Sequence, residues 1–158
     1  MLRRYFVWLL AGVIALPAAA DRYELGTLTI TYPWSRTTAP GMPMGVAYLT
    51  ITNNGKVPDA LVAANTPVAA RVEFHQTSFA DGMARMRPLQ EIVVAPGKAV
   101  KIEPGGIHLM LVDLESALVT GKRVPLTLEF RLAGRITVEL DVKTGDSPPA
   151  AEHSQPPK

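Results

Sequence analysis

Residues 135–143 have the sequence Arg-Ile-Thr-Val-Glu-Leu-Asp-Val-Lys, and the alternation in this stretch decides the fold class. Every second position carries an apolar side chain, namely Ile136, Val138, Leu140 and Val142. Successive side chains of a β-strand point to opposite faces, so a period of two is expected where only one face is buried. The stretch therefore predicts a half-buried strand.

Short runs of a similar kind recur along the chain between turns rich in Pro, Gly and Asn. They cover residues 27–32, 46–52, 60–64, 71–77, 91–94, 99–102, 107–112 and 123–130. Regular short strands separated by such turns predict an all-β domain, built as an antiparallel sandwich or barrel. We expect Trp34 to anchor its core.

Two segments depart from the strand pattern. Residues 36–45 are rich in Pro and Gly and predict a loop. Residues 113–119 predict one or two turns of helix, with Asp113 as the cap and Gly121 just past the end. The chain has no glycine-rich phosphate loop and no alternation of strands with long helices, so a nucleotide-binding α/β fold is not expected.

The two ends of the chain differ from the rest. Residues 1–20 combine Arg3 and Arg4 with an apolar run and three alanines, which predicts a secretory signal peptide cleaved after Ala20. An uncleaved membrane anchor is the alternative, but the apolar run is shorter than the ~20 residues that span a bilayer. Residues 145–158 contain no large apolar side chain and predict a disordered tail, which leaves residues 21–144 as one domain.

Charge and cysteine content exclude several partners. The chain carries sixteen Lys and Arg against fourteen Asp and Glu. Because Arg3 and Arg4 lie in the predicted signal peptide, the exported domain is expected to have no net charge. Such a domain has no electrostatic attraction to nucleic acid or to an anionic membrane. The absence of cysteine leaves no disulfide, no thiolate ligand and no thiol nucleophile.

Two histidines and two methionines form the candidate functional site: His75, Met86, His108 and Met110. In residues 71–77 the apolar side chains at even positions form the core set, which places His75 on the opposite face. In residues 107–112 the core set takes the odd positions, so His108 and Met110 share the other face. Met86 lies in a charged run without a clear strand phase. Three of the four are therefore expected to point away from the core.

The donor set indicates a metal. Taken singly, a methionine commonly fills a gap in packing, but two imidazoles and two thioethers in one short window predict a shared site. Without thiolate or carboxylate, this set suits soft copper(I) better than zinc, calcium or magnesium. Blue-copper electron transfer needs a cysteine, so carriage of copper is expected. Because imidazole must be neutral to bind, copper affinity should fall as the pH drops through the histidine range.

The spacing of these residues resembles a known family. His75, Met86, His108 and Met110 follow the pattern H-x10-M-x21-H-x-M, which is similar to that of the periplasmic PCuAC copper(I) chaperones. The resemblance extends over residues 25–142, including the stretches at 32–36, 86–88 and 104–110. It implies a cupredoxin-like Greek-key β-sandwich that carries one copper(I), and we expect this domain to be a monomer. It also implies delivery to respiratory oxidase assembly, particularly to the dinuclear copper centre of cytochrome c oxidase.

Four further residues are weaker candidates. Many relatives carry a methionine shortly after the first histidine, where this chain has none until Met83, which is the candidate substitute. Met42 and Met44 resemble a hook that assists copper capture or transfer. His153, in the predicted tail, is a candidate copper(II) ligand.

Two other classes of function compete with a metal carrier. An exported β-sandwich interaction or scaffold module would use the same histidines and methionines only for packing. An enzyme is not expected, because the chain has no G-x-S-x-G elbow, and the acids near the window, Glu73, Asp81 and Glu103, show no evident pairing.

Overall fold

The computed structural model describes residues 21–145, so the predicted signal peptide and nearly all of the predicted tail, including His153, lie outside it. The described residues form eleven strands. They are β1 Arg22–Leu25, β2 Leu28–Arg36, β3 Met44–Asn53, β4 Asp59–Asn65, β5 Ala69–Ala80, β6 Met83–Leu89, β7 Ile92–Val94, β8 Ala99–Ile102, β9 Ile107–Leu114, β10 Arg123–Phe130 and β11 Gly134–Lys143.

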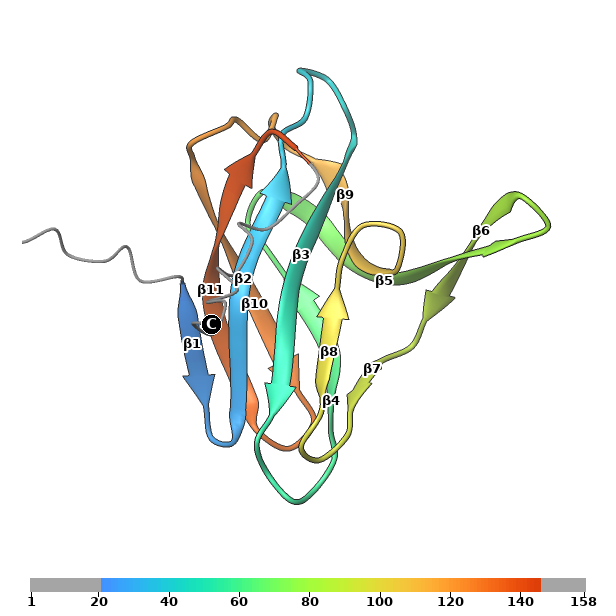
Figure 1. Ribbon diagram of the computed structural model, residues 1–158. Helices are drawn as coiled ribbons and strands as arrows, with labels where there is room; N and C mark the ends of the chain where they lie inside the picture. Colours follow the sequence, from blue (N-terminus) through green and yellow to red (C-terminus); the bar gives the residue numbers. More distant parts are fainter. Residues whose placement is uncertain (1–20, 146–158) are drawn as a thin grey trace, which may run out of the picture.

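The strands close into a β-sandwich, with β2, β3 and β8 in front of β4 and β10 in Figure 1. One hydrogen-bonded path runs β6-β5-β9-β8-β3-β2-β11-β10-β4-β7, with β1 beside β2 and a second pairing of β3 with β9. Most neighbours are antiparallel, whereas β2 with β11 and β8 with β9 are parallel. The prediction of an all-β sandwich is confirmed.

Alternating side chains build the core between the two layers. Val138, Leu140 and Val142 of β11 are buried, and the residues between them keep contact with solvent. Burying one such side chain contributes about 1.5–3 kcal/mol, so the alternation holds the layers together. Trp34 is buried as predicted, and its ring lies 4.7 Å from that of Tyr48 between centroids.

The predicted helix at residues 113–119 is wrong. Asp113 belongs to β9 with a φ of 57°, and an irregular segment without helix follows it. Leu118 is buried in the core. Its backbone N–H donates to the Thr38 hydroxyl at 2.9 Å, and its carbonyl accepts from the Thr38 N–H at 3.0 Å. Tertiary hydrogen bonds therefore replace the ones a helical turn would make.

The predicted loop at residues 36–45 is shorter than expected, because β2 continues to Arg36 and β3 begins at Met44. β2 tolerates Pro33 because its register with β3 shifts between Thr31 and Trp34, so a proline there removes no regular ladder hydrogen bond.

The hairpin of β5 and β6 projects from the sandwich (Figure 1). We call residues 77–87 of this hairpin the arm. Its two-residue turn is Asp81-Gly82, with φ of 53° and 75°, as in the turns that join antiparallel strands most tightly. β6 was not predicted, because six of its seven residues are exposed and the strand therefore shows no alternation of apolar and polar side chains.

Candidate metal centre

The two histidines lie directly opposite each other on neighbouring strands. β5 and β9 are antiparallel, and their register pairs His75 with His108. The imidazole rings stack with their centroids 5.9 Å apart. The two rings therefore lie side by side on neighbouring strands.

The register also brings both methionines to the face that carries the histidines. Met110 pairs with Glu73, and Met86 pairs with Thr77, so each methionine is one diagonal step from His75, in opposite directions along β5. Directly paired residues share a face, and diagonal neighbours are about 7–8 Å apart, within reach of a long side chain. The structure thus gathers all four predicted residues on one face of β6, β5 and β9.

The four side chains differ in exposure. His108 is 6% exposed, the side chain of His75 is 15% exposed, and Met110 is half-buried. Met86, on the arm, is 55% exposed. Three donors are therefore enclosed by the sandwich, and the fourth stands at the surface.

Hydrogen bonds orient both imidazoles. His75 Nε2 lies 3.0 Å from Glu73 Oε2, and a carboxylate accepts, so Nε2 carries the proton in the neutral ring and Nδ1 carries the lone pair. That Nδ1 is buried and has no hydrogen-bond partner. His108 Nδ1 lies 3.2 Å from the Gly106 carbonyl oxygen, to which it donates, and this leaves Nε2 as the lone-pair atom. Each ring thus keeps one nitrogen for a metal.

Glu73 is itself held by a charged network. The Arg71 guanidinium donates to Glu73 Oε1 at 2.8 Å and to Asp113 Oδ2 at 2.7 Å. The hydrogen bond from Arg71, followed by that from His75, lowers the pKa of Glu73 below its ordinary value. The same carboxylates raise the pKa of Arg71. Glu73 therefore stays ionised and keeps accepting from the ring of His75.

The donor set fits a soft metal ion. Across residues 21–145, no group of three or more His, Cys, Asp or Glu side chains is placed to hold a metal. The register places Met86 and Met110 on the same face as the histidine pair. The buried, unpartnered Nδ1 of His75 costs free energy unless it gains a partner, and a metal ion is such a partner.

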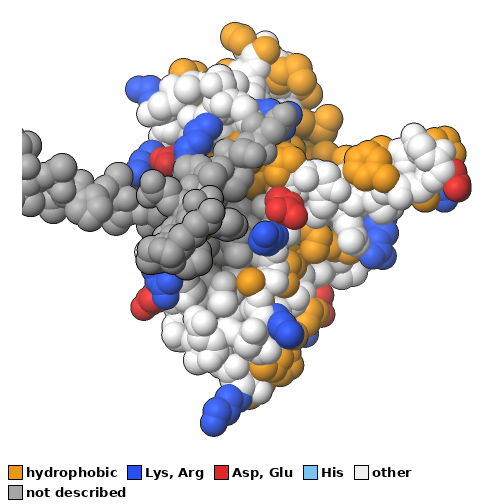
Figure 2. Space-filling view, in the orientation of Figure 1, with side chains coloured by type: hydrophobic (Ala, Val, Ile, Leu, Met, Phe, Trp, Pro, Cys, Tyr) orange, Lys and Arg blue, Asp and Glu red, His pale blue; other side chains and the backbone are white. Residues whose placement is uncertain are grey.

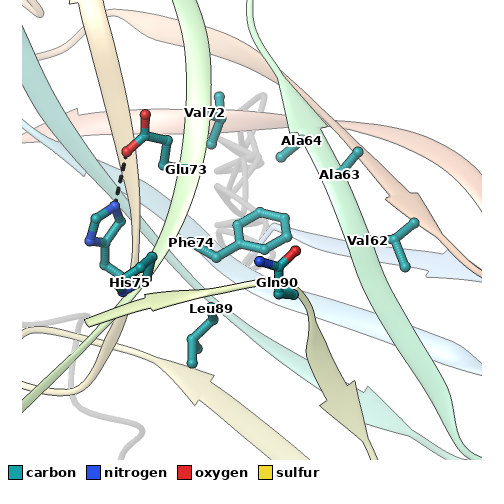
Figure 3. Close-up of a pocket in the computed structure, with 10 residues that line it drawn as sticks. Val62, Ala63, Ala64, Val72, Glu73, Phe74, His75, Leu89 and Gln90 are labelled. Carbon is teal, nitrogen blue, oxygen red and sulfur yellow. Dashed lines mark hydrogen bonds and ion pairs between the residues drawn. The ribbon is translucent and has the colours of Figure 1, made fainter. Parts of the chain in front are cut away.

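A hollow of about 290 Å³ lies between β4, β5 and residues 88–90 (Figure 3). Phe74 and Val72 border it together with residues 62–64 of β4. Figure 3 shows the side chains of Glu73 and His75 turned away from Phe74, toward the opposite side of the strand. The predicted strand phase of His75 is therefore correct, although Glu73 and His75 are themselves among the residues that line the hollow.

The weaker candidates have different positions. Met42 and Met44 line a second hollow together with Met110. Met83 pairs with Ala80 at the tip of the arm, three pairs beyond the one containing Met86, and alternation puts it on the other face. It is therefore a poor substitute for the sulfur that many relatives carry near the first histidine.

Two features of the site were missed from the sequence. Asp81-Gly82 is a recognised hairpin signal, which would have placed β6 and the direction of Met86. Glu73 was expected on the same strand face as His75, but its role as the acceptor that orients the His75 ring was not predicted.

Residues 28–142 match the sequence profile of a family described as "Putative lipoprotein LpqE-like". The chain belongs to the LpqE-like family. A curated relative, "Putative lipoprotein Lxx21020" of Leifsonia xyli subsp. xyli (strain CTCB07), is 26% identical over 133 residues, which cover 82% of this LpqE-like chain and 79% of the relative.

Solved structures extend the comparison to copper proteins. The copper-bound PCuAC domain from PmoF2 superposes with a TM-score of 0.69 at 26% identity, covering 79% of this chain and 99% of that domain. The solution structure of CuI-DR1885 from Deinococcus radiodurans gives 0.61 at 26% identity, covering 81% and 84%. The predicted PCuAC resemblance is confirmed, and copper(I) is the metal named for DR1885. Among residues 21–145, no helix is long and apolar enough to span a membrane.

Proposed function

We propose that this protein is an exported copper(I) chaperone that holds one ion through His75, Met86, His108 and Met110. The observation that carries the proposal is the buried, unpartnered Nδ1 of His75 beside the directly opposed His108. The copper-bound relatives support the choice of metal.

The donor chemistry favours copper in its reduced state. Thioether sulfur is a soft, uncharged ligand, and it stabilises copper(I) relative to harder divalent ions. The two imidazoles are fixed in orientation by Glu73 and by the Gly106 carbonyl, so little reorganisation is needed when the ion binds. This is the chemistry of a carrier and not of a redox enzyme.

The exposed position of Met86 suits transfer by ligand exchange. Its side chain is 55% exposed, whereas the histidines are enclosed. A donor group of an acceptor protein can replace the Met86 sulfur first, while the histidines still hold the ion. Release then proceeds through shared coordination, and free copper never forms.

The proposed cellular role rests on the resemblance to the PCuAC family and on the description of the matched family and of the curated relative as putative lipoproteins. We propose that the protein works outside the cytoplasmic membrane, in the periplasm, and hands copper(I) to respiratory oxidase assembly. The expected acceptor is the protein that carries the dinuclear copper centre of cytochrome c oxidase.

Titration with copper(I) against a competing chelator tests the proposal. Met86→Leu combined with Met110→Leu keeps the side-chain volume nearly constant, so the fold is expected to persist while copper affinity is lost. Met83→Leu is the matched control, because this methionine is equally exposed on the same strand and should leave the affinity unchanged. Unchanged affinity in the double variant would sink the proposal and favour an exported interaction module.

The pH dependence gives a second readout. Copper(I) competes with protons for the imidazole nitrogens, so affinity should be lower at about pH 4.5 than at about pH 7. Equal affinity at the two values would show that the histidines are not both ligands.

A further inference from the structure

Beside the histidine pair, the surface holds a hollow of about 320 Å³ that three methionines line. Met42 comes from the loop between β2 and β3, Met44 from β3 and Met110 from β9. Met42 and Met44 are 49% and 47% exposed. Three thioethers from three segments therefore border one site, and one of them belongs to the proposed copper site.

The strand register connects this hollow to the histidines. β3 and β9 are antiparallel, and they pair Met44 with Val112 and Val46 with Met110. Since paired residues share a face and alternate residues of one strand do too, Met44, Met110 and His108 lie on the same side of the sheet. The hollow and the donor face are continuous through Met110.

The lining favours a soft metal ion over calcium or magnesium. None of the nine residues around the hollow is acidic, and its one charged member is the cation Arg36. Calcium, magnesium and similar ions need anionic or carbonyl oxygens, whereas copper(I) accepts thioethers alone. Figure 2 shows hydrophobic side chains gathered at the upper end of the molecule, where the β2–β3 loop turns over.

The loop that carries Met42 is fixed at both ends. Thr38 exchanges two hydrogen bonds with Leu118 at one end, and the Leu114 N–H donates to the Pro43 carbonyl at 2.9 Å at the other. Between them, Gly41 takes a φ of +79°, which lets the chain turn and present Met42 at the rim. The hollow is therefore a defined feature of the fold.

We propose that Met42, Met44 and Met110 form a second copper(I) site, an entry station from which the ion passes to His75 and His108. This rests on the proposed function, because Met110 serves both sites. Sharing one sulfur means that the two sites are occupied in turn. Met110 stays bound while the imidazoles replace Met42 and Met44, so each step exchanges one neutral donor for another and no electron is transferred.

The station can be observed directly when the histidines are removed. In a His75→Ala, His108→Ala protein with ¹³C-labelled methionine methyl groups, copper(I) should shift the signals of Met42, Met44 and Met110. The Met83 methyl is the internal control and should not move. Shifts confined to Met86 and Met110 would overturn the proposal, since they would report only the remains of the primary site.

Uptake kinetics test the station with both histidines in place, and so do not depend on the folding of the double histidine variant. Met42→Leu combined with Met44→Leu should slow copper(I) uptake from a chelator complex and leave the final affinity unchanged. Met83→Leu should change neither. Uptake at the unaltered rate would overturn the station. Failure of the primary site is distinguishable, because copper(I) would then leave the ring signals of His75 and His108 unshifted in the unaltered protein.

Discussion

The sandwich and the arm are both antiparallel β-structure, but different forces hold them. Strand β9 lies inside the sheet between β5 and β3, and Leu109 and Leu111 are fully buried. The arm is joined to the sandwich at its base, where the Thr77 N–H donates to the Gly106 carbonyl oxygen at 3.0 Å. Beyond Thr77 it is described by the β5–β6 ladder and a two-residue turn, and Phe79 and Met86 are largely exposed. A lone two-stranded hairpin is marginally stable in water. The proposed copper site therefore combines three residues held by packing, His75, His108 and Met110, with one residue, Met86, held by the hairpin. We expect the first three to retain the ion and Met86 to be the ligand that exchanges.

The largest effect should appear in stability. Leu109→Ala removes a fully buried side chain between His108 and Met110, and such truncations cost about 2–5 kcal/mol in the free energy of unfolding. Phe79→Ala truncates a larger side chain on the arm, and exposed sites usually change stability by less than about 0.5 kcal/mol. Urea unfolding of both variants measures the difference. Similar losses would mean that the arm is packed as firmly as the sandwich.

The second largest effect should be a loss of copper(I) affinity when Glu73 no longer orients the ring of His75. Glu73→Ala removes the acceptor that fixes the ring and its tautomer, and the loss of such a partner typically lowers metal affinity about 10–100-fold. Glu73→Gln retains an acceptor oxygen and should lose less. Copper(I) competition titration gives the affinities, and ¹⁵N NMR of the ring gives the tautomer. A Glu73→Ala protein with full affinity and the same tautomer would show that packing alone orients the ring.

The copper(I) affinities of the Met110→Leu and Met86→Leu variants should differ by less than the change expected for Glu73→Ala. Met110 is half-buried and already ordered, whereas fixing the exposed Met86 costs up to about 2 kcal/mol of side-chain entropy. Met110→Leu should therefore weaken copper(I) binding more than Met86→Leu, and Met86→Leu should mainly change the rate of transfer to a chelator. Equilibrium and stopped-flow titrations of the two single variants separate these outcomes. The reverse order of affinities would place Met86 among the firmly held donors.

The smallest effect is the pH dependence of stability at Glu73. Hydrogen bonds from Arg71 and His75 lower its pKa in the folded state below the ordinary value of 4.5. The ionised carboxylate therefore stabilises the folded protein above that value, and the contribution is lost as the pH falls through the lowered pKa. Solvent screens this network, so the effect should be small. The difference in urea midpoint between the unaltered protein and Glu73→Gln should be present at neutral pH and vanish in acid.

Most of the fold could be predicted from the sequence, because burial of one face imposes a period of two. The clearest case is residues 135–143, which form β11 as expected. Segments without one buried face do not show this period. β6 has no buried face and so no alternation. Residues 113–119 have helical end signals, but the backbone N–H and carbonyl of Leu118 are hydrogen-bonded to Thr38.

The sequence by itself determined the donor types, their spacing and, through strand alternation, the outward direction of His75, His108 and Met110. Only the tertiary structure decided that His75 faces His108 across β5 and β9, that Met86 points to the same side, and that Met42 and Met44 meet Met110. The physical reason is that alternation along a strand is a local property. The register between strands depends on turns, bulges and packing contributed by distant parts of the chain.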